Sequence, residues 1–216
     1  ACGCDAPIAP SPDLASDLAP PRGDAATRPP YPVLPPELDV GVYWFGPGDR
    51  SQRYVPGQQN PYYDPTRPTV LHSHGWQRGA VAKGLNKSFN YKRNEPTYGV
   101  DVNAADAWIA AGWNVGLLYW VQLADEDSVT DAEAKIWAAT GPKGLRWRRL
   151  DGSYQDGGVP AASVDELFGQ VLQSALFDYR GPGLRLTGHS LGNQLAMALA
   201  QRLLAGLMEI TLYFTL

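Results

Sequence analysis

The stretch LRLTGHSLGNQLAMALAQRL, residues 184–203, has the pattern GHSLG at its centre, with Ser190 two residues from a glycine on either side. The residues LRLT before the pattern predict a short strand, and the leucines that recur every four residues after it predict a helix. A sharp turn from strand to helix leaves no room for side chains beside the serine, which accounts for the glycines. The N-terminus of the helix directs free N–H groups at any negative charge that develops there. The stretch therefore predicts an exposed, nucleophilic Ser190.

Strands and helices alternate along the rest of the chain, which predicts an α/β fold with a mainly parallel sheet flanked by helices. The expected strands cover 40–45, 69–72, 114–121, 184–187 and 208–216. The expected helices run from a cap at Asp101 to a stop at Gly112, behind the capping box at 163–166, and after Ser190. The irregular stretch 77–99 occupies the position of a substrate-facing loop.

The N-terminal segment differs in composition from the remainder of the 216 residues. Residues 1–37 are rich in Pro, Ala and Asp and have no helical or strand period, so we expect a disordered tether before a core at 38–216. Ala1-Cys2 resembles the end of a bacterial lipoprotein signal, with Cys2 as the lipidated membrane tether. The alternatives are the remainder of a secretory signal or an arbitrary boundary. The first two readings predict a secreted or outer-surface protein.

Composition excludes several function classes. The chain is 44% hydrophobic and 19% charged, with a formal charge of −4. This mild acidity, without a run of Lys or Arg, gives no electrostatic footprint for nucleic acid. No apolar run approaches the ~18 residues of a membrane span, so we expect no transmembrane segment.

A second motif, VLHSHGW at residues 70–76, complements the serine pattern. Ester hydrolysis passes through an oxyanion, which requires preorganised N–H donors. The N–H of Leu191 follows the serine, and the loop after an earlier strand supplies the other donor, for which Trp76 is the candidate. Gly75 lets the backbone of that loop approach the substrate closely.

VLHSHGW followed over a hundred residues later by LTGHSLGNQLA resembles the α/β-hydrolase superfamily, most of all the secreted lipase and carboxylesterase branch that includes pancreatic-type lipases. The resemblance covers about residues 68–204 in motif order, and only the two motifs are specific. It implies that Ser190 is the nucleophile that cleaves a lipid or small carboxylic ester through an acyl-enzyme. It implies also that the amides of Trp76 and Leu191 hold the oxyanion, and that no cofactor is used.

The histidine base of such a site is hard to place. The family order is Ser, then Asp or Glu, then His, but only Glu209 is acidic after Ser190 and all three histidines are at or before position 189. His189 and His74 match structural positions of the family. We expect a chain that stops before the strands carrying the acid and base, and hence little activity. The alternatives are a non-catalytic binding domain on the same scaffold, or a base supplied by His72 or His74. An acyltransferase is a further alternative, because G-H-S-x-G also marks that class.

The remaining charged motifs favour structural roles. Asp125-Glu126-Asp127 lacks calcium-loop spacing, so we expect a solvated acidic loop. His72 and His74 have no evident third metal ligand, and we expect no metal site. The basic run 143–149 predicts a hairpin or surface loop.

Overall fold

The computed structural model describes residues 37–83, 89–91 and 102–206. The tether expected at 1–37, apart from its last residue, lies outside these residues, as do the lipid attachment at Cys2 and the strand expected at 208–216. These three expectations stay predictions. Much of the loop expected at 77–99 also lies outside the described part of the chain.

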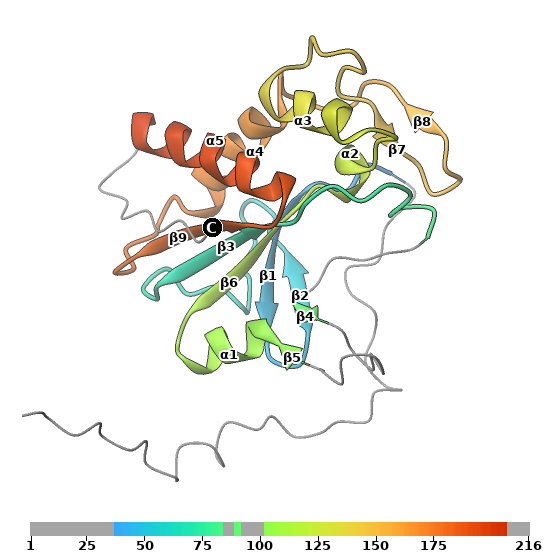
Figure 1. Ribbon diagram of the computed structural model, residues 1–216. Helices are drawn as coiled ribbons and strands as arrows, with labels where there is room; N and C mark the ends of the chain where they lie inside the picture. Colours follow the sequence, from blue (N-terminus) through green and yellow to red (C-terminus); the bar gives the residue numbers. More distant parts are fainter. Residues whose placement is uncertain (1–36, 84–88, 92–101, 207–216) are drawn as a thin grey trace, which may run out of the picture.

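Strands predominate before α1, and strands and helices are interspersed after it (Figure 1). The strands are β1 Gly41–Gly46, β2 Arg50–Arg53, β3 Thr69–Ser73, β4 Asn90–Tyr91, β5 Val102–Asn103, β6 Asn114–Tyr119, β7 Trp147–Arg148, β8 Tyr154–Gln155 and β9 Leu184–Gly188. The helices are α1 Ala104–Ala110, α2 Val121–Ala124, α3 Val129–Trp137, α4 Val164–Ala175 and α5 Leu191–Gly206.

A mixed five-stranded sheet with the order β2-β1-β6-β3-β9 forms the centre of the molecule. β1 is antiparallel to β2 and β6, whereas β6, β3 and β9 run parallel to one another. Ser73 pairs with Leu118 of β6 and with Gly188 of β9, so the three parallel strands end at one edge of the sheet. Ligands of α/β sheets bind at this carboxyl edge.

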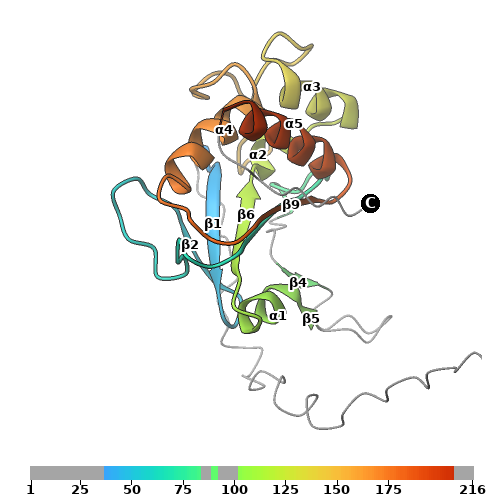
Figure 2. The same cartoon turned by 90° about the vertical axis from the view of Figure 1, so that its left-hand side faces the viewer.

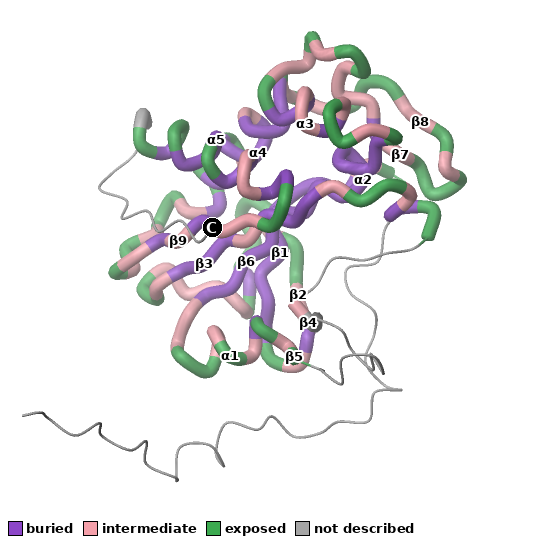
Figure 3. The backbone as a smooth tube through the Cα atoms, in the orientation of Figure 1, coloured by how far each residue is buried: buried purple, intermediate pink, exposed green. Residues whose placement is uncertain are grey.

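Both faces of the sheet are covered, as the alternation of side chains along β1 illustrates. Val42 and Trp44 belong to a buried cluster that includes residues of α3, α4 and α5. Tyr43 and Phe45 belong to a second cluster, which includes Ala105 of α1. Figure 2 shows α4 and α5 on one side of the sheet and α1 on the other, and Figure 3 shows the buried strands between them. The predicted α/β class is therefore confirmed.

The helix boundaries follow local hydrogen bonding. The predicted cap of α1 at Asp101 is wrong, because the side chain of Asn103 accepts hydrogen bonds from the backbone at the start of the helix. Gly112 follows this helix with a φ of 84°, as a glycine stop requires. Ser163 caps α4 as predicted, with Oγ accepting from the N–H of Glu166 at 3.3 Å.

The strand expected at 114–121 is shorter than predicted, since β6 ends at Tyr119 and Val121 already begins α2. Sequence periodicity also gave no sign of β2, of α3 or of the two short strands β4 and β5 before α1. Within the described residues, no helix is long and apolar enough to cross a membrane.

Candidate functional site

Ser190 occupies a tight turn between β9 and α5. Its φ is 53°, and Asp49 is the only other non-glycine residue of the described chain with a positive φ. The N–H of His189 donates to the carbonyl of Ser73 at 3.0 Å, so the ladder between β3 and β9 continues to the turn. The N–H of Asn193 donates to the carbonyl of Ser190 at 3.0 Å and starts the helix. The turn leaves Ser190 exposed at the carboxyl edge of the sheet.

The two glycines of the GHSLG pattern lie where neighbouring backbone atoms leave no room for a Cβ. A Cβ on Gly192 would overlap the carbonyl oxygen of Ser73, and a Cβ on Gly188 would overlap the backbone of Gly192. Backbone atoms cannot move aside as a flexible side chain can. The first turn of α5 is therefore in direct backbone contact with the end of β3.

The segment after β3 lies against the same turn. A Cβ added to Gly75 would lie 2.7 Å from the carbonyl oxygen of His189 and 2.9 Å from Cβ of Ser190. Trp76 follows Gly75, and Leu191 follows Ser190, so the three residues that the sequence singles out come from two segments in contact. Glycine at position 75 permits that contact, while the predicted close approach of this backbone to a substrate stays a prediction.

The N–H groups of Trp76 and Leu191 share one property, the lack of a hydrogen-bond acceptor among the described residues. Leu191 is the first residue of α5, where an N–H has no partner within its own helix. Among the described residues, no group accepts a hydrogen bond from the N–H of Trp76 or of Leu191. Two such donors beside an exposed hydroxyl can stabilise negative charge on an oxygen bound there.

His74 is fully engaged in the scaffold. Its Nε2 accepts the N–H of Trp120 at 3.2 Å, so its Nδ1 is assigned as the donor to the carbonyl of Gly75 at 3.0 Å. The ring stacks on the Trp120 indole, with centroids 5.6 Å apart. His74 therefore holds the segment after β3 against the end of β6, and neither ring nitrogen is available as a base.

His72 points to the opposite sheet face from α5. Its Nδ1 lies 3.0 Å from the Thr187 hydroxyl, and its ring contacts Phe89. Burial, reinforced by the nearby His189, lowers the pKa of His72 to about 4. The third histidine, His189, is exposed and directly precedes the serine. Among the described residues, none accepts a hydrogen bond from the Ser190 hydroxyl.

The acidic run after α2 corrects the expectation of a solvated loop. Asp125 and Glu126 are both 0% exposed, and only Asp127 reaches solvent. The carboxylate of Glu126 lies 2.6 Å from Nζ of Lys135, which is itself 1% exposed, and it receives two hydrogen bonds from Arg146. Burial alone raises the pKa of Glu126, but these hydrogen bonds outweigh it and lower the pKa to about 2.

Two further partners of the acidic run, Arg146 and Arg148, come from the basic segment 143–149, whose strand β7 forms a hairpin with β8. The guanidinium groups of Arg146 and Arg148 lie 3.5 and 3.8 Å from the ring centre of Tyr154. Two runs of opposite charge thus neutralise each other. The sequence does show an acidic run followed by a basic run, but no spacing of residues in either run indicates that the two lie in contact.

No protein-family model, no curated protein and no solved structure that was compared matches this chain. Within the described residues, no group of three or more His, Cys, Asp or Glu side chains could hold a metal ion. The function is therefore inferred from the two motifs and from the geometry around Ser190.

Proposed function

We propose that this chain is a serine ester hydrolase of the lipase or carboxylesterase type on an α/β-hydrolase scaffold. The observation that carries the proposal is the conformation of Ser190, which is exposed with a positive φ at the junction of β9 and α5. A strained serine on a strand-to-helix turn is typical of the nucleophile of that fold. The sheet supports the scaffold, since its three parallel strands end at the edge where Ser190 lies.

The proposed reaction uses few groups. Ser190 Oγ adds to the carbonyl carbon of a carboxylic ester while its proton passes to a solvent water, since no described side chain accepts a hydrogen bond from this hydroxyl. The carbonyl oxygen becomes an oxyanion that accepts hydrogen bonds from the N–H groups of Trp76 and Leu191, each worth about 3 kcal/mol. Collapse re-forms the carbonyl and expels the alcohol, which takes up the proton. Water then hydrolyses the acyl-Ser190 ester to the acid and the free serine.

The engaged histidines favour a second candidate, a binding domain on the same scaffold without catalysis. Both nitrogens of His74 and one of His72 have partners within the fold. We therefore expect slow turnover of esters by this chain, since oxyanion donors and binding alone leave about 10³-fold acceleration over water.

Covalent labelling tests the proposal without requiring turnover. A fluorophosphonate probe transfers its phosphonyl group to an activated serine with loss of fluoride, and mass spectrometry locates the adduct. We expect slow, stoichiometric labelling at Ser190 and none in Ser190→Ala. Ser174→Ala is the matched control, because Ser174 is an exposed serine on α4. A folded wild-type protein that stays unlabelled would overturn the hydrolase and favour the binding domain.

A further inference from the structure

The segment that carries the Trp76 N–H is held by the first two residues of the acidic run. The carboxylate of Asp125 accepts the N–H of Gly79 at 2.7 Å with Oδ1 and the N–H of Val81 at 2.9 Å with Oδ2. The carbonyl of Glu126 accepts the indole N–H of Trp76 at 2.8 Å. Two consecutive residues thus fix both ends of the loop 76–81.

The Asp125 carboxylate is well suited to this task. It is 0% exposed, and Val81, one of the residues that it holds, is 2% exposed. Backbone N–H bonds to an ionised acceptor are about twice as strong as those between neutral groups. An asparagine in its place would offer one acceptor oxygen and an NH₂ group that faces the second N–H. One buried backbone donor would then lose its partner.

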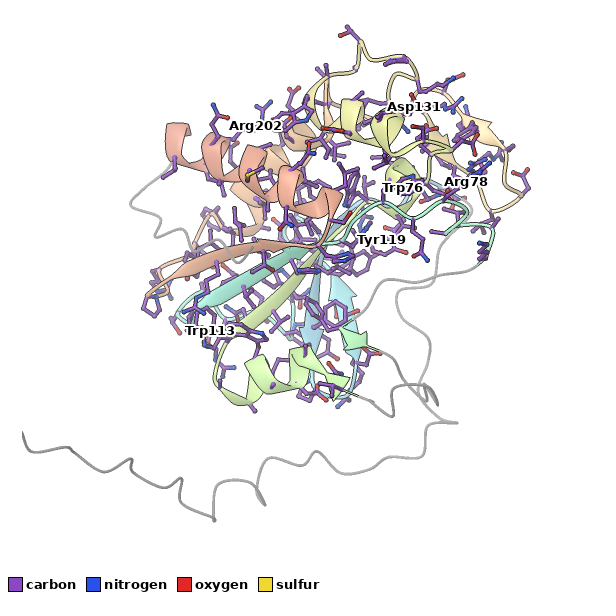
Figure 4. All side chains as sticks on the ribbon, viewed as in Figure 1. Trp76, Arg78, Trp113, Tyr119, Asp131 and Arg202 are labelled. Carbon is purple, nitrogen blue, oxygen red and sulfur yellow. The ribbon has the colours of Figure 1, made fainter. Side chains whose placement is uncertain are left out.

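The acidic run is in turn held by charge. Glu126, next to Asp125, is bound by Lys135 of α3 and by Arg146 next to β7. Arg148 of β7 approaches Asp125 with its Nε at 3.8 Å from Oδ1. Figure 4 shows Trp76 and Arg78 on the segment that follows β3. The support of the loop therefore reaches from the sheet edge to α3 and the β7–β8 hairpin.

We propose that Asp125 is a positioning residue, which holds the loop 76–81 so that the N–H of Trp76 stays aimed at the oxyanion. The catalytic part of this statement rests on the proposed function. Asp125 touches neither substrate nor Ser190, and it acts through the loop backbone. A displacement of the donor by about 1 Å is enough to lower the rate of Ser190 acylation on the order of a hundredfold.

The substitution Asp125→Asn tests this role with two readouts. Hydrogen exchange should become faster at the amides of residues 76–81, while the amides of α4 and α5 keep their protection. Fluorophosphonate labelling of Ser190 should slow by about tenfold to a hundredfold. The matched control is Asp156→Asn, the same change at an exposed carboxylate outside the loop and its supports. It should leave both readouts unchanged.

The two proposals can fail separately. Unchanged exchange over 76–81 in a folded Asp125→Asn variant would overturn the positioning role, whatever the labelling shows. Faster exchange with wild-type labelling would overturn the link from the loop to the oxyanion. A wild-type protein that is not labelled overturns the hydrolase, and the exchange measurement still decides whether Asp125 holds the loop. If Asp125→Asn fails to fold, the wild-type protein still decides the role: the amides of Gly79 and Val81, which donate to Asp125, should be protected from exchange, and fast exchange at both would overturn it.

Discussion

Ser190 combines an exposed hydroxyl with a backbone conformation that L-residues rarely adopt. A residue in the left-handed region costs about 1–2 kcal/mol, since Cβ approaches the following carbonyl. Such strain persists only where the surroundings hold it in place. Here the ladder to Ser73 and the first turn of α5 fix the residue from both sides. The strain keeps the hydroxyl turned out of the sheet.

Glycine should relieve this strain, so Ser190→Gly should be more stable than Ser190→Ala by about 1 kcal/mol. The free energy of unfolding in urea gives the comparison. At the helical control position the order should reverse, with Ser174→Gly about 1 kcal/mol less stable than Ser174→Ala. Equal stability of the two Ser190 variants would show that the turn stores no strain.

The sequence predicts only those parts of the candidate site whose contacts leave a recognisable residue pattern over a few positions. The GHSLG pattern predicts the turn, because the crowding at Gly188 and Gly192 arises within a few residues or from the neighbouring strand end. The role of Asp125 has no such signal. Its partners, Gly79 and Val81, lie more than forty residues earlier in the chain.

At the scale of elements, α3 and the β7–β8 hairpin are joined by charge. Lys135 on α3 and Arg146 beside β7 meet on the buried carboxylate of Glu126. The prediction that Asp125 and Glu126 are solvated rested on the general behaviour of charge runs. It is wrong because both carboxylates are buried beside cationic side chains. The neutralising residues come nine to twenty-three positions later, on elements whose contacts only the tertiary fold decides.

Glu126→Gln leaves two cations around a neutral amide, so it should lower the free energy of unfolding at pH 7 by about 3–5 kcal/mol. Urea denaturation measures the change. Glu133→Gln on α3, at a half-buried position, is the control and should cost less than about 1 kcal/mol. A loss below 1 kcal/mol in Glu126→Gln would show that the ion cluster contributes little to the fold.

At the scale of the whole molecule, the order of the strands was beyond the reach of the sequence. Alternating strands and helices predicted an α/β sheet, and the sheet is confirmed. No local pattern in the sequence indicates that β6 lies between β1 and β3. Nor does one indicate that β2, which is largely exposed, is an edge strand of the sheet. That order arises from burial on both faces, which is a property of the assembled molecule.

Acid should weaken the fold through His72. The folded pKa of about 4 lies below the ordinary value of 6.5. As the pH falls from 6.5 to 4, the unfolded chain takes up a proton that the folded chain does not, so stability is lost across this window and the loss is complete below it. The expected total is about 3 kcal/mol.

Two measurements check the effect of His72. An NMR titration should place the midpoint of its ring near pH 4, and His72→Gln should flatten the decline of unfolding free energy between pH 6.5 and 4. A ring midpoint near 6.5, or an unchanged slope in the variant, would contradict the buried neutral state.

The backbone contact between the end of β3 and the first turn of α5 fixes two segments against each other through their main chains. Gly75 and Gly192 allow this contact, so peptide geometry sets how closely the segment after β3 approaches Ser190, while Asp125 and Glu126 hold the rest of that segment. Surrounding side chains that make none of these contacts are free to change. Under the proposed hydrolase function, a lineage carrying this core could shift from one ester to another by altering only those side chains, while the Ser190 turn stays the same.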